Sequence, residues 1–148
     1  MPLDLSRTLH ALTARLDRAA DRIVQAECGL PYRRFLALYG VAELGEPTQR
    51  ALAEWVGVTE PSMSRMTQVL ARDGHIEVVT VPGGGNRRRI RLSVSGRGVV
   101  ASVGTLLEQR FAELVAAANV SYAEYQTSTN QVLETLTRDQ KPSIEAGC

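Results

Sequence analysis

Residues 59–76, TEPSMSRMTQVLARDGHI, contain the polar side chains whose chemistry is easiest to interpret. On a helical wheel at about 100° per residue, Met63, Met66 and Leu70 fall on one side. The opposite side has no carboxylate and carries Pro61, Ser64, Arg65, Gln68 and Arg72. Arginine can pair with the O6 and N7 atoms of guanine, glutamine can pair with adenine, and serine can reach bases or phosphates. The segment predicts a helix that reads the major groove of DNA; the alternative is an ordinary solvated face.

The preceding residues 49–56 indicate another short helix, packed against the one at 60–73. Ala53 leaves room for two helices to cross, and Gly57 can supply the positive φ of a tight turn between them. Thr59 is expected to cap the helix at 60–73, with Pro61 in its first turn. The expected packing positions are Leu52, Val56, Val58, Met63 and Met66. This spacing predicts a helix-turn-helix, and the alternative is a helical hairpin in an ordinary core.

A β-hairpin is predicted directly after these helices. IEVVTV at 76–81 is rich in β-branched residues, PGGGN at 82–86 contains turn formers, and RRRIRL at 87–92 alternates. Alternation places Arg87, Arg89 and Arg91 on one face, and Arg88, Ile90 and Leu92 on the other. The arginines suit phosphates or a minor groove.

The start of the helix at 49–56 adds a weaker phosphate site, because the backbone amides of Thr48 and Gln49 point out of its N-terminus. The predicted DNA contacts are therefore Thr48, Gln49, Thr59, Pro61, Ser62, Ser64, Arg65, Gln68, Arg72, Arg87, Arg88 and Arg89.

Composition excludes several classes of protein. The chain has 148 residues, enough for one domain with a sizeable core, and its formal charge of +1 argues against a general polycation. Eight Arg and five acids lie in residues 46–97, so the basic excess is central. No signal peptide, membrane span, zinc spacing or disulfide framework is present, and a reduced cytoplasmic setting is expected. No nucleophile elbow, phosphate-binding loop, catalytic carboxylate pair, metal site or cofactor site is found, so we expect a protein that is not an enzyme.

The flanking segments carry apolar stripes at helical spacing. A helix over residues 32–43 is expected to turn Phe35, Leu36, Leu38 and Tyr39 inward. The first stripe is Leu5, Leu9, Leu12, Leu16, Ala19 and Ile23. The stripe after the hairpin is Val99, Val103, Leu106, Leu107, Phe111 and Leu114, and the last is Tyr122, Tyr125, Thr129, Val132 and Leu136. The first and last stripes exceed what a small winged helix can cover, which predicts a homodimer; the alternative is an intramolecular core.

The expected fold is mainly α with a small β-hairpin: a winged helix-turn-helix flanked by dimerisation helices. The expected parts are N-terminal helices at 1–45, the DNA-binding region at 46–95, C-terminal dimerisation helices at 96–140, and a tail at 141–148.

The chain resembles the MarR family of bacterial transcription regulators over nearly its whole length. The resemblance rests on GLPYRRFLALYGVAELGEPTQRALAEWVGVTEPSMSRMTQVLARDGHIE at 29–77, then the wing, then LSVSGRG at 92–98. It implies a homodimer that binds a pseudo-palindromic operator, usually as a repressor. It also implies that small, often phenolic ligands bind the protein and cause it to release the DNA. Many members carry an aspartate in the wing, but residues 82–91 contain no acid, and Gly83, Gly84, Gly85 and Asn86 imply a more mobile wing.

The regulatory residues are less clearly indicated. Tyr32, Phe35 and Tyr39 lie at helical spacing, with His10 across the fold, and they predict either core packing or a ligand pocket. Cys28 allows a redox-sensing alternative, but it lies at the end of the first helix with no Arg or His immediately beside it. A further alternative is a winged-helix module that binds protein. Such modules tend to carry acidic or apolar residues on the face where this chain has Arg65.

Overall fold

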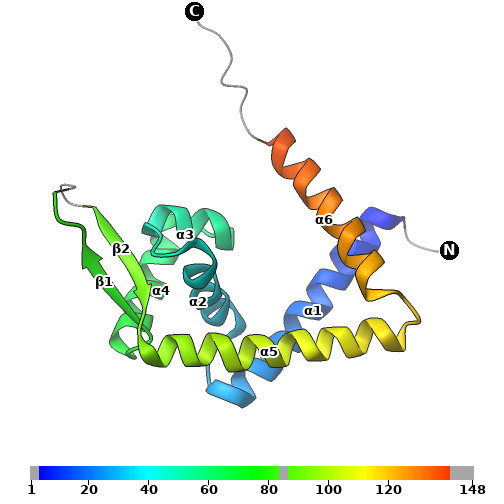
Figure 1. The fold of residues 1–148 in the computed structure, drawn as a ribbon, viewed down its shortest axis with the longest axis horizontal. Helices are drawn as coiled ribbons and strands as arrows, with labels where there is room; N and C mark the ends of the chain where they lie inside the picture. The colour runs from blue at the N-terminus through cyan, green and yellow to red at the C-terminus, as the bar shows by residue number, and fades with distance from the viewer. Residues whose placement is uncertain (1–3, 84–86, 141–148) are drawn as a thin grey trace, which may run out of the picture. The chain divides into compact units, whose positions relative to one another are not determined.

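A computed structural model describes residues 4–83 and 87–140. Figure 1 shows its elements, with the hairpin beside the short helices. In chain order they are α1 (Leu5–Cys28), α2 (Tyr32–Leu44), α3 (Gln49–Val56), α4 (Glu60–Arg72), β1 (Ile76–Thr80), β2 (Arg88–Leu92), α5 (Val94–Ala117) and α6 (Tyr122–Asp139). The chain divides into two compact units, Met1–Leu107 and Glu108–Cys148, and α5 runs through the boundary. None of the helices in the described ranges is both long and apolar enough to cross a membrane.

The helix-turn-helix has the predicted turn and caps. Gly57 ends α3 with a φ of 83°, and the amides of Gly57 and Val58 both donate to the carbonyl of Ala53. The hydroxyl of Thr59 accepts from the amide of Ser62 and caps α4, which has a proline in its first turn. A left-handed residue and a side-chain cap therefore set the path between the two helices. Both features were predicted from the sequence and are confirmed.

The hairpin is antiparallel, with a register from Ile76↔Leu92 to Thr80↔Arg88. Ile90 and Leu92 are buried, as alternation predicts, and the amide of Ile90 donates to the carbonyl of Pro47 at 2.9 Å. This bond joins β2 to the segment before α3. The predicted mobility of the tip concerns residues that lie, apart from Gly83, outside the described ranges.

The core of the first unit lies where α2, α3, α4 and β2 meet. Its largest fully buried side chains include Leu38, Leu52, Met63, Leu70 and Ile90. Gly40 allows the close approach of α3, because a Cβ atom there would lie 2.6 Å from the ring of Trp55. Tyr39 corrects one expectation, since it is partly exposed and Ala37 is buried instead. The inward face of α2 is therefore displaced from the predicted one.

The junction between α4, β1 and α5 is also tight. The carbonyl of His75 accepts from the amide of Ser93, and the hydroxyl of Ser93 donates to the carbonyl of Gly74. Gly96, in the first turn of α5, lies so close to His75 that a Cβ atom would be 2.1 Å from the carbonyl oxygen. The LSVSGRG segment therefore contains a glycine that the packing requires.

The first helix remains largely uncovered. Val24 is the buried residue of α1, whereas Leu5 is 74% exposed and Leu9 44% exposed. An apolar stripe of this kind is normally covered in a folded protein, since its burial contributes about 25 cal/mol per Å².

The second unit joins the end of α5 to α6. Ser121 caps α6, the hydroxyl of Tyr122 donates to the carboxylate of Glu108, and the rings of Phe111 and Tyr125 lie 6.5 Å apart. One expectation needs correction, because Val115 is buried where Leu114 was predicted. The predicted stripe of α6 is exposed beyond Tyr125 in the single chain, with Val132 66% exposed and Leu136 53% exposed.

Candidate nucleic-acid interface

The polarity of α4 matches the wheel. Met63, Thr67 and Leu70 are buried against the core, and Met66 is half-buried. The exposed side carries Pro61, Arg65, Gln68 and Arg72, and Ser62 and Ser64 are half-buried at its margin. The nearest carboxylates along the chain are Glu60 in the first turn and Asp73 after the last. Between these two ends, the exposed face of α4 carries no carboxylate.

The arginines of this face differ in their partners. The Nε atom of Arg72 lies 3.6 Å from a carboxylate oxygen of Asp73, so part of its charge is offset locally. Arg65 forms no ion pair with any residue in the described ranges. Of the two, Arg65 is the one whose guanidinium is available for an outside acceptor.

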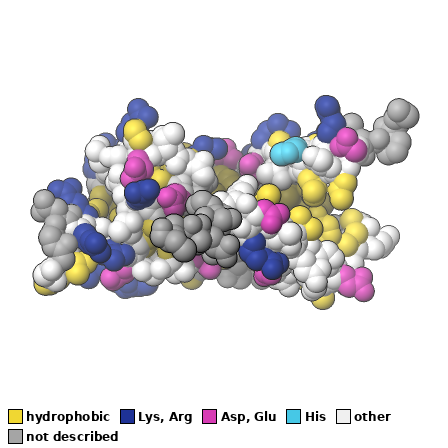
Figure 2. Space-filling view, turned by 90° about the horizontal axis from the view of Figure 1, so that it is seen from above, with side chains coloured by type: hydrophobic (Ala, Val, Ile, Leu, Met, Phe, Trp, Pro, Cys, Tyr) yellow, Lys and Arg dark blue, Asp and Glu magenta, His cyan; other side chains and the backbone are white. Residues whose placement is uncertain are grey.

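The hairpin presents further arginines. Arg87 and Arg88 are exposed and Arg89 is half-buried. Arg91 instead bonds Glu77, its cross-strand partner, with nitrogen-to-oxygen distances of 2.8 Å. Figure 2 shows basic side chains, with some acidic ones, around the end of the first unit that carries the hairpin. Arg91 therefore stabilises the strand pair, whereas Arg87, Arg88 and Arg89 remain candidates for phosphate contacts.

Thr48 and Gln49 use their side chains within the protein. The hydroxyl of Thr48 accepts from the amide of Ala51 at 3.2 Å and caps α3. The side-chain amide of Gln49 lies 3.2 Å from the hydroxyl of Thr67 on α4. Their backbone amides are in the first turn of a helix, where no intrahelical acceptor exists, so these can still meet a phosphate.

The hydrogen bond between Thr67 and Gln49 was not predicted from the sequence. A threonine among Met63, Met66 and Leu70 on the apolar side was the available signal, because a buried hydroxyl needs a partner. The spacing within α4 could not identify that partner, which lies 18 residues away.

The predicted ligand residues form a row of rings, except for His10. Ring centroids lie 6.5 Å apart for Tyr32 and Phe35, and 6.3 Å apart for Phe35 and Tyr39. Trp55 on α3, which the sequence reading did not include, extends the row at 6.3 Å from Tyr39. His10 is exposed on α1, and no ring contact or hydrogen bond joins it to these rings within the described ranges.

Tyr32 and Cys28 belong to the packed end of α1 and α2. Burial raises the pKa of Tyr32, and the negative charge of Asp17 adds to that rise. Cys28 is half-buried, and its thiol donates to the carbonyl of Val24 at 3.3 Å. This environment is that of a small packing residue in a helix, and it supplies no feature that favours redox sensing.

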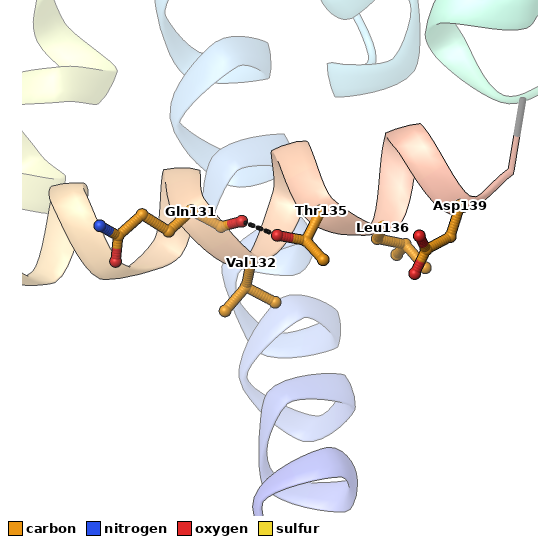
Figure 3. A pocket seen from close by; sticks show the side chains of 5 residues that line it. All are labelled: Gln131, Val132, Thr135, Leu136 and Asp139. Carbon is orange, nitrogen blue, oxygen red and sulfur yellow. Dashed lines mark hydrogen bonds between the residues drawn. The ribbon is translucent and has the colours of Figure 1, made fainter.

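A surface depression lies elsewhere, on α6. It is lined by Gln131, Val132, Thr135, Leu136 and Asp139, and Figure 3 shows Val132 and Leu136 among the lining side chains. The dashed line there is the bond from the Thr135 hydroxyl to the Gln131 carbonyl. All five lining residues come from one helix, and none is a predicted ligand residue. The depression is best described as part of the exposed face of α6.

Comparison with solved structures places the fold. MarR from E. coli in its apo form is 20% identical, with 96% of this chain and 100% of that chain covered and a TM-score of 0.73. MepR from Staphylococcus aureus in complex with DNA is 18% identical, with coverages of 94% and 100% and a TM-score of 0.73. S. aureus MarR in complex with salicylate and kanamycin is 16% identical, with coverages of 91% and 91% and a TM-score of 0.77.

The chain therefore has the winged-helix fold of the MarR-family transcription regulators, with helices before and after the helix-turn-helix and its hairpin. The fold resemblance predicted from the sequence is confirmed. No protein-family model matches the chain, and a search of curated proteins also gives no match.

Proposed function

We propose that this protein is a cytoplasmic, sequence-specific DNA-binding transcription regulator of the MarR type, and not an enzyme. The observation that carries the proposal is the exposed face of α4, on which Arg65 and Gln68 stand without an intervening carboxylate. That face lies on a fold similar to that of MepR, which was solved in complex with DNA.

The proposed contacts divide the work between bases and phosphates. Arg65 and Gln68 enter the major groove, where their paired donors and acceptors match guanine and adenine edges. Ser62 and Ser64 lie at the margin of that contact. Arg87, Arg88 and Arg89 on the hairpin, and the first-turn amides of α3, bind phosphates and orient the helix. Base contacts thus supply sequence preference, and phosphate contacts supply affinity.

The functional form is proposed to be a homodimer. The support is the exposed apolar side of α1, with Leu5 and Leu9, and separately that of α6, with Val132, Leu133 and Leu136. Faces of this composition are covered when a second copy packs against them. A two-fold dimer presents two recognition helices about 34 Å apart, which suits a pseudo-palindrome with half-sites about 10 base pairs apart.

Regulation is proposed to act by release from the operator on binding a small phenolic ligand, with repression as the outcome at the target gene. The ring row of Tyr32, Phe35, Tyr39 and Trp55 supplies aromatic surface on which such a ligand can stack. Trp55 is the single tryptophan of the chain, so its fluorescence reports binding directly. Salicylate that quenches Trp55 and weakens DNA retention would support this role; retention that is unchanged despite quenching would oppose it.

The direct test of DNA binding is retention of fragments from the DNA upstream of the protein's own coding sequence, measured at two salt concentrations. We expect one fragment that contains an inverted repeat to be retained more tightly than random DNA, with affinity falling as salt rises. Failure to retard any fragment at either concentration would favour the protein-binding module instead.

A further inference from the structure

Thr67 is the buried polar side chain of the described core, at 5% exposure. It lies on the inner side of α4 between Met63 and Leu70, which are fully buried apolar residues. A hydroxyl in such surroundings destabilises the folded state if it has no hydrogen-bond partner. The position therefore needs a hydrogen bond, and the partner determines what the residue does.

Two acceptors lie within reach of the Thr67 hydroxyl. The carbonyl of Ser64, one turn earlier in α4, is 2.9 Å away, and the side-chain amide of Gln49 on α3 is 3.2 Å away. The hydroxyl has one proton. In one arrangement the Thr67 hydroxyl donates to the side-chain oxygen of Gln49. In the other it donates to the Ser64 carbonyl, and the side-chain amide of Gln49, with its oxygen and nitrogen exchanged, donates to the Thr67 hydroxyl. In both arrangements the bond between Gln49 and Thr67 joins the two helices.

This bond has a directional effect that the apolar contacts lack. Met63 and Leu70 hold α4 against the core, but apolar packing tolerates small rotations and shifts of a helix more readily than a hydrogen bond does. Thr67 is adjacent in sequence to Gln68 and two residues after Arg65, so its azimuth around the helix axis fixes theirs. A rotation of α4 would move both exposed side chains across the groove.

We propose that Gln49 is a positioning residue that acts through Thr67 to fix the rotation of α4, and so determines sequence preference without its side chain contacting DNA. The inference rests on the proposed DNA-binding function. The backbone amide of Gln49 remains in the first turn of α3, where it can meet a phosphate. One residue would then couple the phosphate contact of α3 to the base contacts of α4.

The test uses the full-length protein with Gln49→Met, which keeps the length of the side chain, and Thr67→Val, which keeps its shape. Each variant should weaken binding to the best-retained fragment about fivefold to tenfold, the range expected for one net hydrogen bond. Affinity for random DNA and the salt slope should stay unchanged. The double variant should be no weaker than either single one, because both remove the same bond. Thr67→Ser, which keeps the hydroxyl, should restore most of the preference.

A DNA-free measurement accompanies it. Urea unfolding of wild type, both single variants and the double variant should give non-additive losses of stability, and additive losses would overturn the proposal. Losses of DNA affinity that add in the double variant would also overturn the proposal, because Gln49 would then act independently of Thr67. Losses that are equal on the preferred fragment and on random DNA would overturn it too, because the Gln49 side chain would then contact the DNA backbone directly. If wild type prefers its operator and neither variant changes that preference, the positioning role alone is wrong. If wild type shows no preference, the proposed function fails, and the positioning role fails with it.

Discussion

The carboxylate of Asp21 on α1 accepts a hydrogen bond from the backbone amide of Tyr32 at 2.9 Å, so one helix caps the next. Pro31, at the N-cap position of α2, provides no side-chain hydrogen bond. The second carboxylate oxygen of Asp21 accepts from Gln25 at 2.7 Å. A charged acceptor at the N-terminus of a helix is favourable because the free amides there carry partial positive charge. The contact fixes α2, and through it the base of the helix-turn-helix, against α1.

This contact predicts a pH dependence of stability. The hydrogen bond from Tyr32, and then that from Gln25, lower the pKa of Asp21 from its ordinary value of 3.8. Because the folded state binds the proton less readily than the unfolded state, the contribution is complete above about pH 4 and is lost as pH falls through the lowered pKa. Asp21→Asn should be less stable than wild type at pH 6 in urea unfolding, and the difference should shrink in acid. A difference in stability between Asp21→Asn and wild type that is equal at both pH values would contradict the assignment.

Gly96 should tolerate no side chain. Alanine there would place its Cβ atom 2.1 Å from the carbonyl oxygen of His75, a backbone atom that cannot swing away. We expect Gly96→Ala to lower the free energy of unfolding by about 1–3 kcal/mol, as overpacking does. Gly98→Ala is the matched control, since no heavy atom outside the local helix backbone lies within 4 Å of its Cβ position, and alanine favours a helix by about 0.5–1 kcal/mol. Urea unfolding should therefore give opposite signs for two substitutions two residues apart.

Arg65 should carry sequence preference. Arg65→Ala is expected to cost about 1–3 kcal/mol on the preferred operator and to relax discrimination at one base position, as removal of a base contact does. Fluorescence anisotropy with operator and random duplexes measures both effects. Arg33→Ala, which removes an exposed arginine of α2, is the charge-matched control and should bind as wild type does. Equal losses on the two duplexes would reassign Arg65 to the phosphates.

Arg87 should act through charge alone. Its removal is expected to weaken all duplexes alike and to reduce the slope of log affinity against log salt by about one, the value for one phosphate contact. A titration at four salt concentrations with Arg87→Ala and with the Arg33→Ala control measures the change in slope. An unchanged slope with weaker binding would mean that Arg87 supports the hairpin and does not contact DNA.

The exposed face of α6 should control assembly. The double substitution Val132→Glu and Leu136→Glu places two charges on the apolar stripe and should lower the molar mass in sedimentation from that of two chains to that of one. Thr127→Glu adds a charge at an exposed position roughly opposite that stripe on the same helix and should leave the mass unchanged. A wild-type protein that sediments as a single chain would exclude the proposed homodimer.

Local chemistry made much of this fold predictable from the sequence. Gly57 and Thr59 act within a few residues of themselves, so the turn and cap of the helix-turn-helix follow from their types. The alternation that buries Ile90 and Leu92 is likewise a property of one strand. The outward direction of Arg65 and Gln68 followed from the apolar positions on the other side of the same helix.

Contacts between distant segments depended on the tertiary structure. The partners Gln49 of Thr67, Asp21 of Tyr32 and His75 of Gly96 lie 18, 11 and 21 residues away. No period along one helix encodes such distances, and for the same reason periodicity predicted Leu114 where packing buries Val115. Sequence thus determined which way α4 faces, because that depends on the apolar residues of the helix itself. The tertiary structure decided which groups hold it there, because a hydrogen bond or a close contact requires two surfaces to be placed within a few ångströms.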